Sequence, residues 1–131
     1  MPRPRKTFTG KFDPPLRPCG GEVHLRLPAP WRAPAHRGVR FLVVLIEESG
    51  GMWIYSPQGV DRLLRKANRA NHDDVQVRMA LRRVFGKARE VICDETHTLA
   101  FNEDFIRTST RLGTTARLIG RTHHFEVTPP E

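Results

Sequence analysis

An internal repeat limits the folds open to this 131-residue chain more than any other feature of its sequence. Residues 24–31 align without gaps with residues 98–105. Apolar or aromatic residues coincide at three positions: Leu25 with Leu99, Leu27 with Phe101 and Trp31 with Phe105. Residues 53–57 likewise align with residues 125–129, each an aromatic residue followed three positions later by Ser-Pro or Thr-Pro. This self-similarity predicts two units built on one pattern and related by a pseudo-twofold axis in a barrel.

Hydrophobic patterning predicts the strands of both units. Residues 24–28 alternate between polar and apolar, as in a half-buried strand, while the apolar run 39–46 and its return at 52–55 predict a core hairpin. The first 21 residues contain five prolines and end in two glycines, which is typical of an arm with short edge strands at best. In the second unit the same signals predict four strands and one short helix: strands over 89–93, 98–101, 116–119 and 125–127, with the helix over 103–110.

A helical hairpin is predicted between the two units. Ser56 and Pro57 mark the start of its first helix, as N-cap and first helical residue. One apolar face of that helix is formed by Val60, Leu63, Leu64 and Ala67. The same spacing recurs in a second helix after Asp73 and Asp74: Val77, Ala80, Leu81, Val84 and Phe85. The residues expected to be largely buried are Leu25, Leu27, Trp31, Val43, Leu45, Trp53, Leu99, Phe101, Phe105, Leu118 and Phe125.

The net positive charge of the chain indicates which kinds of binding partner to expect. Lys and Arg number 22 against 14 Asp and Glu, a net charge of +8, which favours nucleic acid or an anionic membrane surface. The longest apolar run, Val39–Ile46, is too short to span a bilayer, and the N-terminus lacks a signal peptide's apolar stretch. Cys19 and Cys93 have no CxxC partner, so neither a disulfide framework nor a structural zinc site is expected. A soluble, cytoplasmic protein without a membrane partner is therefore predicted.

Motifs spread from Phe8 to Pro129 resemble those of the MraZ family of transcriptional regulators. They are Phe8-x-Gly10, Pro28-x-x-Trp31-Arg32, Trp53-x-Tyr55-x-Pro57, Phe85-Gly86-x-Ala88-x-Glu90-x-x-x-Asp94 and Gly120-x-x-x-x-Phe125-Glu126. The resemblance implies an α+β fold, a tandem swapped-hairpin (SpoVT/AbrB-like) double-repeat β-barrel with a helical hairpin between the repeats. It divides a single domain, residues 1–131, into a first repeat at 7–56, a connector at 57–84 and a second repeat at 85–130.

The resemblance also implies a function. Such a protein is a DNA-binding regulator, associated with the nucleoid, whose subunits form a homo-oligomeric ring. The ring binds double-stranded DNA at direct repeats upstream of its own operon, the division and cell-wall gene cluster. The alternative is a ring-forming interaction or structural protein that keeps the fold but has lost sequence-specific DNA binding.

The two turns that carry DNA contacts in the family, Asp-x-x-x-Arg, are altered here. In the first repeat, alignment on the strand puts Gly20 at the Asp position and His24 at the Arg position. Alignment on Phe8 and Gly10 puts Arg17 at the Asp position instead, with about three extra residues in the 18–22 loop. In the second repeat Asp94 is kept, and His97-Thr98 replaces the usual Gly-Arg.

The candidate DNA-binding residues follow from these positions and from charge. Four belong to the N-terminal arm: Arg3, Arg5, Lys6 and Lys11. Arg17, His24 and Arg26 are expected to form a patch on the outer face of the 24–28 strand, and His97 belongs to the second turn. A solubilising arm and a solvated sheet face are about equally consistent with these residues. A basic stripe, Arg62, Arg65, Lys66 and Arg69, suits nucleic-acid phosphates, acids of a neighbouring subunit or plain solvent.

No catalytic motif is present. The chain lacks a Gly-rich phosphate loop, HExxH and Gly-x-Ser-x-Gly, so a non-enzyme without cofactor or metal is expected. His123 and His124 are adjacent, would point to opposite faces of a strand, and are expected in the turn of the final hairpin. His97 beside Asp94 and Cys93 has no third partner at a recognisable spacing. A basic ribonuclease remains a remote alternative.

Overall fold

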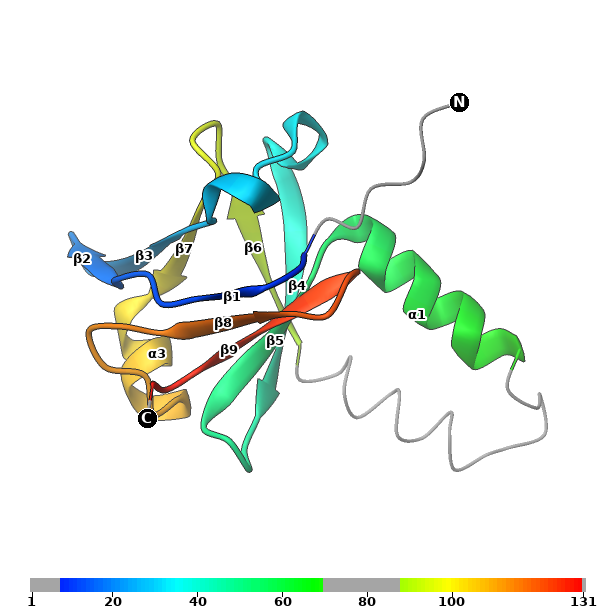
Figure 1. Ribbon diagram of the computed structural model, residues 1–131. Helices are drawn as coiled ribbons and strands as arrows, with labels where there is room; N and C mark the ends of the chain where they lie inside the picture. The colour runs from blue at the N-terminus through cyan, green and yellow to red at the C-terminus, as the bar shows by residue number, and fades with distance from the viewer. Residues whose placement is uncertain (1–7, 70–87, 131) are drawn as a thin grey trace.

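The computed structural model describes residues 8–69 and 88–130 of the chain (Figure 1). Its strands are β1 (Lys11–Phe12), β2 (Arg17–Cys19), β3 (Glu22–Arg26), β4 (Val39–Ile46), β5 (Gly51–Tyr55), β6 (Arg89–Cys93), β7 (Thr98–Asn102), β8 (Arg117–Gly120) and β9 (His124–Thr128). Its helices are α1 (Pro57–Arg69) and α3 (Glu103–Ser109), with single 3₁₀ turns η1 (Ala29–Trp31) and η2 (Pro34–His36).

The described strands form one antiparallel sheet of nine, in the order β1-β8-β9-β5-β4-β6-β7-β3-β2. The sheet curls into a half-barrel, with α3 near one end and α1 extending away from the other side (Figure 1). The fold is therefore a small α+β protein, as the sequence predicts at this level. No helix within residues 8–69 and 88–130 is long and apolar enough to cross a membrane.

Two strand pairs join the first half of the chain to the second. In β3 and β7, Leu25 lies opposite Leu99, and the flanking pairs are His24 with Ala100 and Arg26 with Thr98. In β5 and β9, Trp53 lies opposite Glu126, flanked by Met52 with Val127 and Ile54 with Phe125. The hairpins also cross over, because β4 pairs with β6 and β8 pairs with β1.

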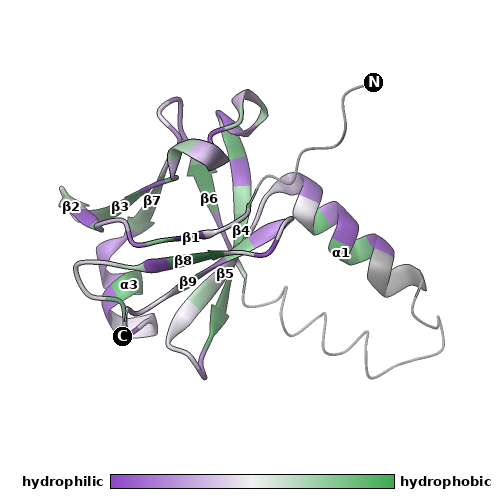
Figure 2. Cartoon of the chain, in the orientation of Figure 1, coloured by the Kyte–Doolittle hydropathy of each residue, from purple (hydrophilic) through white to green (hydrophobic). Residues whose placement is uncertain are grey.

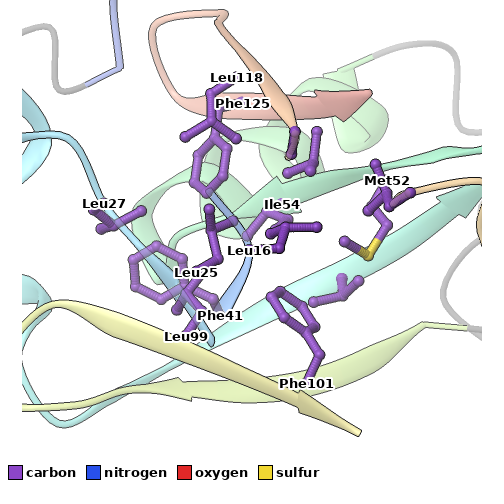
Figure 3. Close-up of a cluster of buried hydrophobic side chains, with 14 of the residues drawn as sticks. Leu16, Leu25, Leu27, Phe41, Met52, Ile54, Leu99, Phe101, Leu118 and Phe125 are labelled. Atoms are coloured by element: carbon purple, nitrogen blue, oxygen red, sulfur yellow. The ribbon is translucent and has the colours of Figure 1, made fainter. Parts of the chain in front are cut away.

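The inner face of the curled sheet holds the core (Figure 3). Its largest fully buried side chains include Trp31, Phe8, Phe41, Phe125, Leu25, Leu27, Met52, Ile54, Leu99 and Leu118. Phe8 packs edge-to-face on Trp31 with ring centroids 5.4 Å apart, and the Trp31 indole Nε1 donates to the Thr9 carbonyl at 2.8 Å. Trp31 therefore both fills the core and fixes the chain just ahead of β1.

The burial predictions hold with two exceptions. Trp53 is 36% exposed and Leu45 is only half-buried, whereas the other nine predicted core residues are buried. The prediction for Trp53 is wrong because alternation along β5 turns Met52 and Ile54 inward, which points the residue between them outward. Its indole Nε1 donates instead to Glu126 Oε1 on β9 at 3.0 Å.

The first predicted helix is confirmed as α1, capped by Ser56, whose Oγ accepts from the Gly59 backbone N–H at 3.2 Å. Hydrophobic and hydrophilic residues alternate along α1 (Figure 2), although Leu64 on the predicted apolar face is 46% exposed. The second predicted helix, within residues 77–85, lies outside the described residues. The predicted hairpin of the first unit and the strands and helix of the second are confirmed to within a few residues.

Candidate nucleic-acid interface

A groove of about 1080 Å³ lies beside the β2–β3 hairpin. The segment 12–15 and the Leu27–Pro30 stretch line it together with β2, β3 and the turn that follows β6. Four basic side chains reach it: Arg17, His24, Arg26 and Arg32. Asp13 is the one acidic residue among the described lining residues, and its carboxylate is paired with Arg117 at 3.1 Å. The groove is therefore cationic, and its basic groups come from three separate elements.

The β2–β3 hairpin brings two of the sequence-predicted residues together. Arg17 on β2 lies opposite His24 on β3, so both side chains occupy the same face of the sheet. Gly20 and Gly21 form the tip with φ of +56° and +85°, a backbone conformation that favours glycine. Pro18 is tolerated because β2 is an edge strand, where a missing N–H breaks no ladder. The extra loop residues that the sequence indicates before Val23 thus extend a β-hairpin.

Alternation along β3 places His24 and Arg26 on the outer face, as predicted. Val23 and Leu25 are buried, His24 is half-buried and Arg26 is exposed. The Arg26 Nε donates to the Thr96 carbonyl at 3.3 Å, which ties β3 to the turn between β6 and β7. His24 Nε2 lies 3.4 Å from Glu22 Oε1. Thr96 and Thr98 line the same groove as these cations, and their hydroxyl oxygens lie 2.9 Å apart.

The turn between β6 and β7 is closed by one carboxylate. Asp94 Oδ1 accepts from the Thr96 N–H at 2.8 Å, the Thr98 N–H at 3.0 Å and the Thr96 hydroxyl at 2.7 Å. Slight burial alone would raise the pKa of Asp94, but these three hydrogen bonds and the nearby His24 hold it below its usual value. The Asp94 carboxylate therefore accepts its hydrogen bonds within the turn and stabilises the turn's conformation.

His97 occupies the left-handed position of that turn, with φ of +60°. Its ring Nε2 lies 2.8 Å from the Ala33 carbonyl, so the side chain contacts the segment before η2. His97 is not among the residues that line the groove. The structure therefore separates it from Arg17, His24 and Arg26.

The remaining predicted residues lie elsewhere. Lys11 is exposed on β1, opposite Ile119, and does not line the groove. Arg3, Arg5 and Lys6 lie outside the described residues.

Arg32 lines the groove although sequence reasoning did not place it in the site. Its Nε donates to the Leu27 carbonyl at 2.8 Å, which holds the guanidinium against the end of β3. Arg32 ends the Pro28-x-x-Trp31-Arg32 motif, but no spacing in the sequence places it beside the groove.

The groove has the chemistry of an anion-binding surface. Guanidinium groups with neighbouring hydroxyls suit phosphate oxygens, to which most protein–DNA hydrogen bonds are made. Within residues 8–69 and 88–130, no group of three or more His, Cys, Asp or Glu residues is arranged to hold a metal ion. Neither a protein-family model nor a curated protein matches this chain.

Proposed function

We propose that the chain is an MraZ-like, DNA-binding transcriptional regulator built from two swapped-hairpin repeats. The first repeat is residues 7–56, the second is residues 85–130, and residues 57–84 connect them. The register of β3 and β7 supports this proposal, because pairs on either side of Leu25–Leu99 exchange equivalent positions of the predicted repeat: His24 with Ala100, and Arg26 with Thr98. A pseudo-twofold axis through Leu25–Leu99 requires this exchange.

The crossed hairpins support the swap. The β4–β5 hairpin of the first repeat pairs with β6 of the second, and the β8–β9 hairpin of the second pairs with β1 of the first. The β5–β9 register favours one change to the sequence alignment. A twofold axis through Trp53–Glu126 would make Met52 equivalent to Phe125 and Ile54 equivalent to Val127, and all four residues are buried. Residues 53–57 would then align with residues 126–130, one position later than in the sequence alignment.

DNA is the proposed ligand of the groove, and one observation carries this assignment. Arg17, His24, Arg26 and Arg32 converge on one groove together with Thr96 and Thr98, next to the turns that contact DNA in the family. Arg3, Arg5 and Lys6 would add sequence-independent phosphate contacts. In a ring, weak contacts from each subunit multiply through effective concentration, which suits direct repeats upstream of the protein's own operon and a nucleoid location.

A double substitution tests this assignment. The Arg17→Ala/Arg26→Ala protein is compared with wild type by gel shift on the duplex upstream of its gene and on a scrambled duplex, across a salt series. We expect wild type to remain selective above about 150 mM salt. The variant should lose its preference and bind the upstream duplex about tenfold or more weakly.

The matched control removes the same charge elsewhere. Arg40 and Arg107 are exposed, are paired with Glu90 and Asp104, and do not line the groove. Arg40→Ala/Arg107→Ala should keep its selectivity. Unchanged selectivity in the groove variant, or equal loss in the control, would refute the groove as the site of sequence readout.

A second function, a ring-forming interaction protein without sequence-specific DNA binding, is favoured by a separate observation. Arg26 donates within the chain to Thr96, and Thr98 stands at the position of the second-turn arginine in the family pattern. Base readout usually requires Arg, Lys, Asn or Gln side chains that reach base edges. For this function, both duplexes should bind equally and dissociate together as salt rises, while light scattering still reports a closed oligomer.

A further inference from the structure

A second cationic pocket lies away from the groove, where the start of α1 meets the β8–β9 turn. Its volume is about 560 Å³, within the usual range for small-molecule sites. Arg62 and Arg65 reach it from α1, Arg121, His123 and His124 from the turn and the start of β9, and Tyr55 from β5. In Figure 1 this region lies on the right, and the β2–β3 hairpin lies on the left.

The walls of this pocket are held in place by backbone contacts. A Cβ on Gly59 would lie 2.2 Å from the His123 carbonyl oxygen, so α1 rests directly on the turn and only glycine fits there. Thr122, with φ of +76°, is fixed by two backbone hydrogen bonds with Phe8, of 2.7 and 3.2 Å. The Arg121 N–H also donates to the His124 carbonyl at 2.9 Å. The pocket is thus preformed, which lowers the ordering cost of binding.

The pocket has more cationic side chains than acidic side chains paired with them among the described residues. Arg121 pairs with Glu126 at 2.7 Å, and Arg65 pairs with Asp61 at 2.9 Å. Arg62 has no acidic partner among the described residues. Burial and the neighbouring Arg62 lower the pKa of His123, so the imidazole itself experiences this positive field. A bound anion would relieve the field.

The rest of the lining is aromatic and apolar. The His124 ring stacks on Tyr55, with ring centroids 4.5 Å apart and planes 17° apart. Leu63 of α1 completes this wall. A pocket much larger than a phosphate ion, lined by arginines together with Tyr55, His124 and Leu63, suits a ligand that carries both a phosphate and a ring.

We propose that this pocket binds a nucleoside phosphate, with its phosphates against Arg62 and the β8–β9 turn. This site does not depend on the DNA-binding proposal, and it gives Arg62, the first member of the basic stripe, a ligand of its own. Because three arginines line the pocket, a diphosphate, which carries more negative charge and more acceptor oxygens, should bind more tightly than a monophosphate ion.

Calorimetric titration of the full chain in phosphate-free buffer tests the site with ADP, inorganic phosphate and adenosine. ADP should bind at least about tenfold more tightly than inorganic phosphate, and adenosine should give no measurable binding. Proton NMR should show the ring signals of His123 and His124 titrating at higher pH when ADP is present, because a bound anion stabilises their charged forms.

Arg62→Ala should weaken ADP binding about tenfold or more, since one charge-assisted hydrogen bond is lost. The matched control is Arg107→Ala on α3, which removes an exposed helical arginine outside the pocket and should bind ADP like wild type. No binding of ADP, equal binding of ADP and inorganic phosphate, or an unaltered affinity in Arg62→Ala would each overturn the proposal. A change of oligomeric mass in Arg62→Ala without a change in ADP affinity would assign the pocket to a second copy of the chain instead.

Discussion

The β2–β3 hairpin and the β6–β7 turn both reverse the chain direction, but they differ in length and in the contacts that stabilise them. Each reverses the chain ahead of one of two paired strands, β3 and β7. The first is extended, with glycines at its tip, an edge strand and exposed cations. The second is tight, with three hydrogen bonds to Asp94 and a histidine in the left-handed position. The β2–β3 hairpin therefore presents its cationic side chains to the groove, whereas the β6–β7 turn, closed by Asp94, contributes Thr96 to the groove's lining.

The largest effects should come from the pair that the two hairpins share. Leu25 and Leu99 are both fully buried and lie opposite each other. Leu25→Ala and Leu99→Ala should each lower the free energy of unfolding by about 3–5 kcal/mol, because each leaves a cavity at the same place in the core. Urea denaturation measures both. A difference of more than about 2 kcal/mol would break the symmetry between the two hairpins.

Asp94→Ala should have a smaller effect, confined to the tight turn. We expect a loss of about 1–2 kcal/mol, since the carboxylate caps two backbone N–H groups and a hydroxyl at an exposed site. Asp104→Ala, which removes a carboxylate that is exposed on α3, is the control and should cost less.

The effect of Asp94 should also depend on pH. Its folded-state pKa lies below the value of an unfolded Asp, about 3.9, so the carboxylate contributes fully above that pH. The contribution is lost as the pH falls through the lower folded-state pKa. Wild type and Asp94→Ala should therefore converge in stability as the solution is acidified below about pH 4. A constant difference down to about pH 2 would assign the effect to something other than the charged carboxylate.

The smallest predicted effect separates backbone from side chain at His97. His97→Ala loses the contact with the Ala33 carbonyl and keeps an unfavourable left-handed φ. His97→Gly loses the same contact but relieves the backbone, so it should be more stable than His97→Ala by about 1 kcal/mol. Urea midpoints of the two variants decide this. Equal midpoints would mean that the turn relaxes away from the left-handed conformation.

Much of the fold is predictable from local patterns. Alternation at 24–28 orients His24 and Arg26 outward because it buries Leu25 and Leu27. Ser56-Pro57 predicts the start of α1 because the capping side chain and the fixed φ of proline act within one turn. These signals are short-range, so a single sequence carries them.

The short edge strands that the sequence allows in its proline-rich arm are confirmed, because β2 pairs with β3 at the edge of the sheet, a position that tolerates Pro18. One failure is local: Trp53 is predicted to be buried, yet alternation along β5 turns Met52 and Ile54 inward and Trp53 outward. Arg32 reaches the groove only because the chain folds η1 against the end of β3. No spacing in the sequence encodes that approach.

The crossed strands have a consequence for how the chain is made. β1 gains its ladder partner only from residues of β8, about 100 positions later in the chain. A pairing of this sequence separation closes a long loop, and such contacts slow folding. On the ribosome, the first half of the barrel must wait with β1 unpaired until residues 117–120 have emerged. Folding should therefore be completed only after β8 has been made, and a nascent chain stalled before β8 should remain sensitive to protease in the segment that contains β1.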